Sequence, residues 1–216
     1  MSHADADLVV EPLQSEEVAT AAQLLARAFA HETHFSRILP DPRRRARTLA
    51  AVMGLSVRDA QPFGHVYAAR RAGGELAAVA VWLPPGRFPL GALRTLRATP
   101  DIVRLAAHAR SGLRPLLRFA STLRGLHPEE PYWYLVAIGA DPGYAGRGAG
   151  SAVLRAGTER ADAAGQVCWL ETQEEPTVGW YQRFGFAVHG PVLDFPEGFR
   201  SWQMRRPALR PGQGRP

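Results

Sequence analysis

A strand-to-helix turn rich in glycine, Ile138-Gly139-Ala140-Asp141-Pro142-Gly143-Tyr144-Ala145-Gly146-Arg147-Gly148-Ala149-Gly150-Ser151, is the most informative stretch of this sequence. Glycines at positions 146, 148 and 150 lack a Cβ atom, so the backbone amides around them can approach a ligand closely. A helix is predicted to begin in this turn, and its first N–H groups have no partner within the helix. Together with the positive end of the helix dipole, these groups favour an anion. The turn therefore predicts a diphosphate site, to which Arg147 can add a charge-assisted contact.

Two common nucleotide-binding motifs are excluded by the position and sequence of this turn. The Rossmann fingerprint needs its glycines after the first strand of a βαβ unit, with an acidic residue about 20 positions later. Here the turn lies two-thirds of the way along the chain. A triphosphate-binding P-loop needs Gly-Lys-Ser or Gly-Lys-Thr, and neither follows. Because glycine-rich turns of this kind also occur without a ligand, the surrounding sequence has to decide.

Hydrophobic periodicity on both sides of the turn alternates between strands and helices. The spacing predicts strands at 8–10, 65–70, 76–83, 132–140, 167–172, 186–193 and 199–204, and helices at 15–29, 42–55, 148–164 and 178–184. Residues 86–126 are helical and amphipathic, and Pro100 and the pair Ser111-Gly112 are predicted to divide them into two or three helices. We expect one mixed α/β domain over residues 1–206, followed by a disordered tail at 207–216.

The composition excludes several classes of protein. The chain has 216 residues, 46% of them hydrophobic and 21% charged, which is typical of a soluble globular protein. Its one cysteine, Cys168, lies in an apolar strand, which excludes a disulfide framework and a multi-cysteine zinc site. The seven histidines have no metal-ligand spacing, so we expect no metal. No apolar run approaches the roughly 20 residues of a membrane span and the N-terminus is polar, so we expect a cytoplasmic protein that binds no membrane.

One segment concentrates positive charge. Residues 87–124 carry eight arginines against one acid, Asp101, whereas the net charge of the whole chain is +6. Arginines repeat every four residues at 110, 114 and 118, a spacing that could follow nucleic-acid phosphates. The segment lacks the interleaved aromatic residues of a nucleic-acid surface, since it contains only Phe88 and Phe119. We therefore favour an amphipathic lid over a substrate pocket and expect no nucleic-acid partner.

About thirty residues after the glycine turn, the sequence Gly179-Trp180-Tyr181-Gln182-Arg183-Phe184-Gly185-Phe186 predicts an aromatic helix that ends at a glycine and enters a strand. Together, the turn and this helix resemble the Gcn5-related N-acetyltransferase (GNAT) superfamily. The resemblance implies a central, mostly antiparallel sheet, splayed at strand 132–140, with helices on both faces. It also implies that acetyl-CoA is the co-substrate.

The resemblance assigns the acetyl-CoA contacts residue by residue. The strand Ile138-Gly139-Ala140 would hydrogen-bond the pantetheine arm, and Thr177 and Tyr181 would complete the site. The pyrophosphate would be held by the turn, through Ala145, Gly146, Arg147, Gly148, Ala149, Gly150 and Ser151. Ala145 stands where the superfamily usually has Gln or Arg, and Thr177 stands where Asn is common. These two departures alter side-chain contacts and leave the amide cradle intact.

Shorter segments resemble puromycin N-acetyltransferase and its relatives. They are Ala28-Phe29-Ala30, Ala80-Val81-Trp82-Leu83-Pro84, Glu130-Pro131-Tyr132-Trp133-Tyr134-Leu135, Leu170-Glu171-Thr172 and 192–204. The resemblance implies an acceptor that is a puromycin-like aminonucleoside or another amine metabolite or antibiotic, a role in antibiotic resistance, and an acceptor site capped by residues 86–126. Candidate acceptor contacts are Phe29, Trp82, Tyr132 and Trp133, with core packing as the alternative for these aromatic residues.

Two side chains are candidates for the chemistry of acetyl transfer. Tyr181 is the predicted general acid, because a phenol and the departing thiol have similar pKa values; an ordinary packed aromatic is the alternative. Glu171 is the predicted general base, because it ends a strand beside the cofactor strand, where active-site carboxylates of open α/β sheets tend to lie. A water chain held by the backbone, with Glu171 in a structural ion pair, is the alternative. A backbone N–H near Ile138 or Gly139 is the candidate oxyanion donor.

The predicted reaction is direct transfer of an acetyl group from acetyl-CoA to a primary amine of a small molecule, in a ternary complex. A covalent intermediate is disfavoured because Cys168 is predicted to be buried. Two alternatives belong to other classes. One is an acetyl-CoA-binding sensor that contacts a protein partner through its basic helices. The other is a protein N-acetyltransferase, against which the insertion argues. The sequence is compatible with a monomer or a homodimer.

Overall fold

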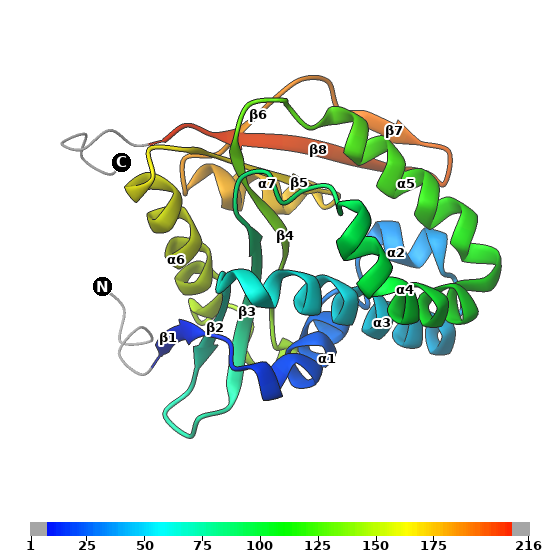
Figure 1. The fold of residues 1–216 in the computed structure, drawn as a ribbon, viewed down its shortest axis with the longest axis horizontal. Coiled ribbons are helices and arrows are strands. Elements are labelled where there is room, and N and C mark those ends of the chain that lie inside the picture. The colour runs from blue at the N-terminus through cyan, green and yellow to red at the C-terminus, as the bar shows by residue number, and fades with distance from the viewer. Residues whose placement is uncertain (1–7, 209–216) are drawn as a thin grey trace.

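The computed structural model describes residues 8–208, which form a mixed sheet with helices on both faces (Figure 1). The strand order is β1-β2-β3-β4-β5-β8-β6, and β7 pairs with β8. Neighbouring strands are antiparallel except β4 and β5, which run parallel. The strands are β1 Val9–Pro12, β2 Val66–Arg70, β3 Leu76–Leu83, β4 Tyr132–Ala140, β5 Val167–Thr172, β6 Ala187–Val188, β7 Leu193–Phe195 and β8 Phe199–Arg206. The predicted mixed, mostly antiparallel fold is confirmed.

Helices cover the two faces of the sheet unequally. One face is covered by α6 (Ala149–Ala163), which also carries the chain from β4 to the parallel strand β5 (Figure 1). The other face is covered by α1 (Val18–Ala28) and α3 (Pro42–Ala60). The remaining helical segments are η1 Ser15–Glu17, α2 Thr33–Ile38, η2 Gln61–Phe63, α4 Ala92–Ala109, η3 Arg110–Gly112, α5 Leu113–Leu126, η4 Pro142–Tyr144 and α7 Glu175–Gln182.

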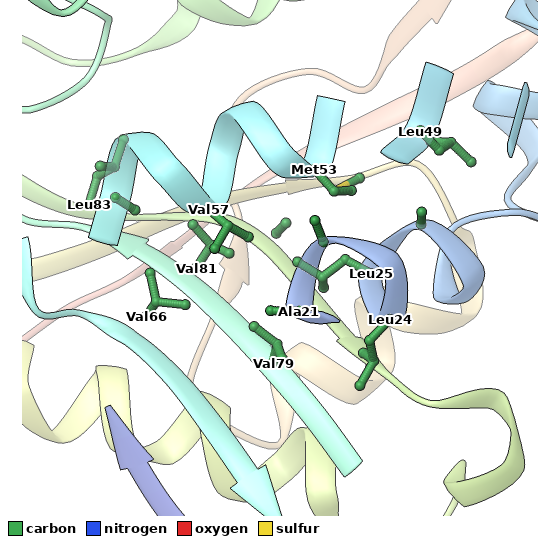
Figure 2. Close-up of a cluster of buried hydrophobic side chains, with 14 of the residues drawn as sticks. Ala21, Leu24, Leu25, Leu49, Met53, Val57, Val66, Val79, Val81 and Leu83 are labelled. Atoms are coloured by element: carbon green, nitrogen blue, oxygen red, sulfur yellow. The ribbon is translucent and has the colours of Figure 1, made fainter. Parts of the chain in front are cut away.

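Alternate residues of β3 point to opposite faces and fill two separate cores. Those that face α1 and α3, in the core drawn in Figure 2, are Val79, Val81 and Leu83. On the other face, Trp82 packs on α6 at Gly157, where a Cβ atom would lie only 2.1 Å from the indole ring. Gly139 of β4 has the same role under α1, because a Cβ there would lie 2.7 Å from the Cβ of Ala28.

Strands β4 and β5 separate soon after they meet. They pair only where residues 132–134 lie beside residues 167–169. A bulge follows, in which Val136 is skipped in the register with β3. Bulges bend a strand and re-aim its side chains. From residue 135 onward, the edge of β4 that faces β5 therefore carries backbone groups without a partner on β5. The predicted splay within 132–140 is confirmed.

The segment 86–126 contains α4 and α5, joined by η3, at the right of Figure 1. Its helical character and the break at Ser111-Gly112 are confirmed, but the predicted break at Pro100 is wrong, because α4 runs through it. Pro100 is exposed, so water can bond the carbonyl group that its ring leaves unpaired. Arg58 of α3 fixes α4 by donating to both carboxylate oxygens of Asp101, at 2.9 and 2.8 Å.

Two further elements differ from the expectation. Helix α2 was not predicted, because one short turn-and-a-half of helix gives too little periodicity to detect. The predicted strand at 186–193 is wrong, since only the short strands β6 and β7 form there. Both pair with the long strand β8, which supplies the hydrogen bonds that hold them. Of the expected tail, residues 209–216 lie outside the described residues.

Candidate active site

A cavity of about 980 Å³ lies at the opening between β4 and β5. One part is lined by Ile138, Gly139 and Ala140 on the free edge of β4, by the glycine turn and by α7. The other part is lined by α3, by the loop before α2 and by the insertion helices α4 and α5. The predicted cofactor segments and the predicted lid thus border one continuous space.

The glycine turn places the start of α6 at the wall of this cavity. Gly146 and Gly148 have φ angles of 77° and 83°, which residues with a Cβ rarely adopt. Gly148 is the N-cap of α6, and no side chain caps the helix. The first amides of α6, at residues 149–151, therefore have no acceptor within the helix. With Ala145, these residues line the cavity, and amides in this arrangement can bind an anion.

Two predicted cofactor contacts are placed differently from the rest. Arg147 is exposed, and its guanidinium lies over the ring of Tyr144, 5.0 Å from the centroid. It is not part of the cavity wall that the described residues form. Thr177 does line the cavity, but its hydroxyl donates to the carbonyl of Glu174 at 2.7 Å. The Thr177 side chain thus holds the start of α7.

Helix α7 brings Tyr181 to the same cavity. Its ring is buried and packs edge-on against Trp180 and Phe186, with centroid distances of 4.8 and 5.8 Å. Burial, assisted by the negative charge of Glu32, raises the pKa of Tyr181 well above its ordinary value. The phenol therefore stays protonated across the physiological pH range, but it is a weaker acid than the match with the thiol pKa in the sequence analysis assumed.

Glu171 lies in the cavity wall just beyond the point where β4 and β5 separate. Only 3% of its side chain is exposed. The hydroxyl of Tyr134 donates to its Oε2 atom at 2.7 Å, whereas its Oε1 atom makes no hydrogen bond with the described residues. Burial raises the pKa of Glu171 to about 7, against the lowering effect of the Tyr134 hydrogen bond. The carboxyl group therefore exchanges its proton near neutral pH, as a general base must.

His127, which the sequence analysis did not place in the site, faces this carboxyl group. It is the C-cap of α5, and its Nε2 atom lies 3.3 Å from Oε1 of Glu171. Its ring stacks on Tyr132 at a centroid distance of 5.3 Å. Burial lowers the pKa of His127 to about 4, so it is neutral. The only sequence signal was the pair His127-Pro128, which marks the end of the helical segment.

A second carboxyl group in the cavity was also missed. Glu32 lines the cavity immediately before α2, next to His34, which lines it as well. Burial and the charge of Glu174 raise the pKa of Glu32 to about 8. Burial lowers the pKa of His34 to about 3. Because α2 itself was not predicted, no pattern indicated that these side chains point inward.

Three of the four predicted acceptor contacts are core residues. Phe29 lines the cavity as expected. Trp82 and Trp133 point to the α6 side of the sheet and are buried there, away from the acceptor part of the cavity. Tyr132 lies on the other side, but His127 and the strand neighbours cover it and leave 7% exposed. The alternation of side chains along β3 and β4 decides these positions.

Comparison with protein families decides which class this geometry belongs to. A model described as the acetyltransferase (GNAT) family matches residues 30–186, which is more than half of the chain. The chain belongs to the acetyltransferase (GNAT) family. This GNAT protein is thus an enzyme of the N-acetyltransferase class, whose members use acetyl-CoA as the acetyl donor. The resemblance based on the glycine turn and the Tyr181 helix is confirmed at the level of the superfamily.

Solved structures have the same fold. A protein described as histone acetyltransferase HPA2 and related acetyltransferase, from Corynebacterium glutamicum, is 24% identical with a TM-score of 0.69, covering 95% of this chain and 99% of its own. A polyamine N-acetyltransferase from Drosophila melanogaster is 17% identical with a TM-score of 0.59, covering 93% and 100%. The ribosomal-protein-S18-alanine N-acetyltransferase from Escherichia coli is 14% identical with a TM-score of 0.51, covering 96% and 97%. At these identities the likeness concerns the fold alone.

The described residues contain no cluster of metal ligands, and the thiol of Cys168 is buried. Within residues 8–208, no group of three or more His, Cys, Asp or Glu side chains could hold a metal ion. In the same part of the chain, no helix has the length and apolar character needed to cross a bilayer. Cys168 is buried, and burial raises the pKa of its thiol to about 12. This thiol stays protonated at neutral pH and is a poor nucleophile.

Proposed function

We propose that this GNAT protein transfers the acetyl group of acetyl-CoA directly to a primary amine of a small molecule, in a ternary complex. The observation that carries the proposal is the continuity of the cavity. The backbone anion site at the start of α6 and the carboxyl group of Glu171 line one space of about 980 Å³. A donor bound at one end and an amine bound at the other meet at the opening between β4 and β5.

In this proposal, backbone groups bind the acetyl donor. When bound, acetyl-CoA supplies an acetyl thioester as the electrophile. The amides of residues 148–151 hold its pyrophosphate, and the free edge of β4 at Ile138, Gly139 and Ala140 hydrogen-bonds its pantetheine arm. N–H groups of the same edge, at Ile138 or Gly139, stabilise the oxyanion. Ala145 adds no polar side chain, so the amides provide most of the affinity.

Glu171 and Tyr181 divide the proton transfers. A free alkyl ammonium group has a pKa near ~10 and must lose a proton before the nitrogen can attack. Glu171 takes that proton and passes it to solvent. As the N–C bond forms and the C–S bond breaks, Tyr181 donates a proton to the sulfur and regains one from the acetylated nitrogen. Tyr134 positions Glu171 through the hydrogen bond to its Oε2 atom.

The acceptor part of the cavity favours a small amine with an apolar body. Its walls include Phe88 and, from α5, Leu113, Leu116, Phe119 and Leu123. The insertion covers this part, which supports a small molecule over a protein chain as the acceptor. A puromycin-like aminonucleoside, or another amine metabolite or antibiotic, fits this description, with antibiotic resistance in the cytoplasm as the proposed role. One chain supplies every group named, so a monomer suffices and a homodimer is compatible.

Release of free thiol from acetyl-CoA tests the proposal. Purified protein is assayed with puromycin, aminoglycosides, polyamines, amino acids and lysine peptides. We expect turnover with one class of small amine. Silence across the panel, in protein that binds acetyl-CoA, would favour the sensor alternative. Turnover with peptides alone would favour a protein N-acetyltransferase.

Tyr181→Phe separates catalysis from binding. Removal of the phenol oxygen leaves the packed ring in place but removes the proton donor. We expect kcat to fall by about tenfold or more while the Kd of acetyl-CoA changes by less than about twofold. Calorimetric titration with acetyl-CoA, beside steady-state kinetics, measures both quantities. An unchanged kcat would assign the protonation of the thiolate to another group.

A further inference from the structure

Glu32 is a carboxyl group in the cavity that the proposed acetyl transfer does not use. Its side chain is 27% exposed and lines the same space as Glu171. Burial and the neighbouring Glu174 raise its pKa to about 8. Its own charge, in turn, contributes to the raised pKa of Tyr181. A carboxyl group in such a position is unstable as an anion unless a cation joins it.

The protein itself supplies no such cation. Among the ion pairs of residues 8–208, Glu32 has one partner, His34, whose Nδ1 atom lies 3.5 Å from Oε2 of Glu32. His34 is 2% exposed and neutral, because burial lowers its pKa to about 3. Its Nδ1 atom is buried without a hydrogen bond, although the residue lines the cavity. The two arginines of the wall, Arg124 and Arg183, have exposed side chains. Glu32 and His34 therefore both lack a ligand that donates N–H groups.

Glu174 is a near neighbour of Glu32, although it lines an adjoining pocket with Thr33 and not the cavity itself. Its Oε1 atom accepts a hydrogen bond from the backbone N–H of Thr33. The bond joins the loop after β5 to the first residue of α2, and it fixes Glu174 beside Glu32. Two neighbouring carboxyl groups attract a cation more strongly than one carboxyl group does.

Glu32 and Glu171 belong to different elements of the cavity wall, since Glu32 precedes α2 and Glu171 lies on β5. Burial, assisted by the charge of Glu171, raises the pKa values of Tyr132 and Tyr134. Burial raises the pKa of Tyr181, and the charge of Glu32 adds to that shift. The remaining walls are largely apolar, with Phe35, Leu116 and Phe119 among them. The cavity thus offers two carboxyl groups from different elements, in mainly apolar surroundings.

We propose that Glu32 and His34, with the charge of Glu174 nearby, form a second cation-binding subsite, and that the preferred acceptor is a diamine. Its primary amine is acetylated at Glu171, its second ammonium or guanidinium group binds at Glu32, and an apolar spacer joins the two. The inference rests on the proposed function, because that function places the reacting amine at Glu171. A dication pairs with both carboxyl groups, whereas a monoamine leaves one of them without a partner.

A matched series of amines tests the subsite. Linear alkylamines and α,ω-diamines of three to eight carbons are compared by thiol release from acetyl-CoA. We expect the best diamine to exceed the monoamine of equal length by at least about tenfold in kcat/KM, since a buried charge pair is gained. The spacer length at the optimum measures the separation of the two carboxyl groups. Equal kcat/KM values for the two series would overturn the proposal.

Glu32→Gln keeps the shape of the side chain and removes its charge. We expect this variant to lower the diamine kcat/KM to the level of the monoamine and to change the monoamine value by less than about threefold. Glu175→Gln is the control, because Glu175 lies on the same side of the molecule, is 67% exposed and pairs with Arg200. It should keep the diamine preference. An equal loss for both series in Glu32→Gln would mean that Glu32 acts in the reaction, and would overturn the subsite.

Binding heats give a readout that does not depend on turnover. At pH 7, Glu32 is mostly protonated, and an ammonium group favours its ionised form. Binding of 1,6-diaminohexane should therefore release up to about one proton more than binding of hexylamine. Titrations in buffers of different ionisation enthalpy measure this difference, which should vanish in Glu32→Gln. If no amine is acetylated, the proposed function fails, and Glu32-dependent binding of the diamine still decides for the subsite or, by its absence, against it.

Discussion

The cofactor end of the cavity and its acceptor end differ in what they are made of. At the cofactor end, residues 138–151 are continuous in the sequence and present mainly backbone amides. At the acceptor end, side chains come from the loop before α2, from α3, from the insertion and from β5. A local backbone conformation can be encoded by a short motif, whereas a pocket of distant side chains depends on how the whole chain packs. Substitutions at one end should therefore change one step and spare the other.

Glu171→Gln should have the largest effect. The amide keeps an acceptor for Tyr134 but cannot take a proton, so kcat should fall by about a hundredfold, with the Kd of acetyl-CoA unchanged. Because the pKa of Glu171 is raised to about 7, its basic form gains population as pH rises. The wild-type kcat/KM should accordingly rise between pH 6 and 8, and that rise should be smaller in the variant. Steady-state kinetics across this range measure both effects.

The outcome distinguishes the two candidate routes for the proton. Retention of most of the activity in Glu171→Gln would favour the water chain held by the backbone. Glu175→Gln, which removes an exposed carboxylate from the start of α7, serves as the matched control and should be kinetically silent. A loss of acetyl-CoA affinity in Glu171→Gln would contradict the independence of the two ends of the cavity.

Gly148→Ala tests the cofactor end, with an intermediate effect. Its φ of 83° costs a residue with a Cβ about 1 kcal/mol, and relaxation of the turn displaces the amides at the start of α6. We expect the Kd of acetyl-CoA to rise by about fivefold, with amine selectivity unchanged. Gly179→Ala on α7 is the control, since a Cβ there meets nothing within 4 Å and φ is not positive. An altered amine preference in Gly148→Ala would contradict the independence of the ends.

Leu116→Ala tests the acceptor end and should have the smallest effect. Leu116 lines the cavity and packs against the core below it. Truncation removes apolar surface worth about 1 kcal/mol from a partly exposed wall. We expect KM for apolar amines to rise by several fold while the Kd of acetyl-CoA stays the same. Calorimetry and amine saturation curves on the same preparation measure both; a weaker acetyl-CoA complex would refute the assignment of α5 to the acceptor.

Much of the fold was predictable from local pattern. The strands at 76–83, 132–140 and 167–172 have the expected boundaries, because each is an apolar run bounded by Gly, Pro or polar residues. The errors have one cause. Pro100 lies inside α4 because it is exposed, so water can replace the backbone hydrogen bond that proline removes. The segment 186–193 does not form one strand because β8 is the strand with which β6 and β7 pair. Both outcomes depend on surroundings in the folded protein, which hydrophobic periodicity does not show.

The candidate site, too, was predictable only in part. The amide cradle and the position of Tyr181 followed from the turn and the aromatic helix. Trp82 and Trp133 were expected at the acceptor, but the register of β3 and β4 turns them toward α6. Neither Glu32 nor His127 belongs to a recognisable pattern. Glu32 reaches the cavity from the start of α2, and His127 reaches Glu171 from the end of α5, and packing sets the direction of both segments.

The sequence by itself determined the GNAT superfamily, the sheet and the backbone site at the start of α6, because glycine spacing and apolar periodicity act over a few residues. The tertiary structure alone decided which side chains share the acceptor cavity. It brings Glu32, Glu171 and the insertion helices to one space and excludes Trp82 from it. The physical reason is the distance along the sequence over which each property is determined. Backbone conformation is fixed by near neighbours, whereas burial, and with it the raised pKa values of Glu32 and Glu171, is fixed by everything packed around them.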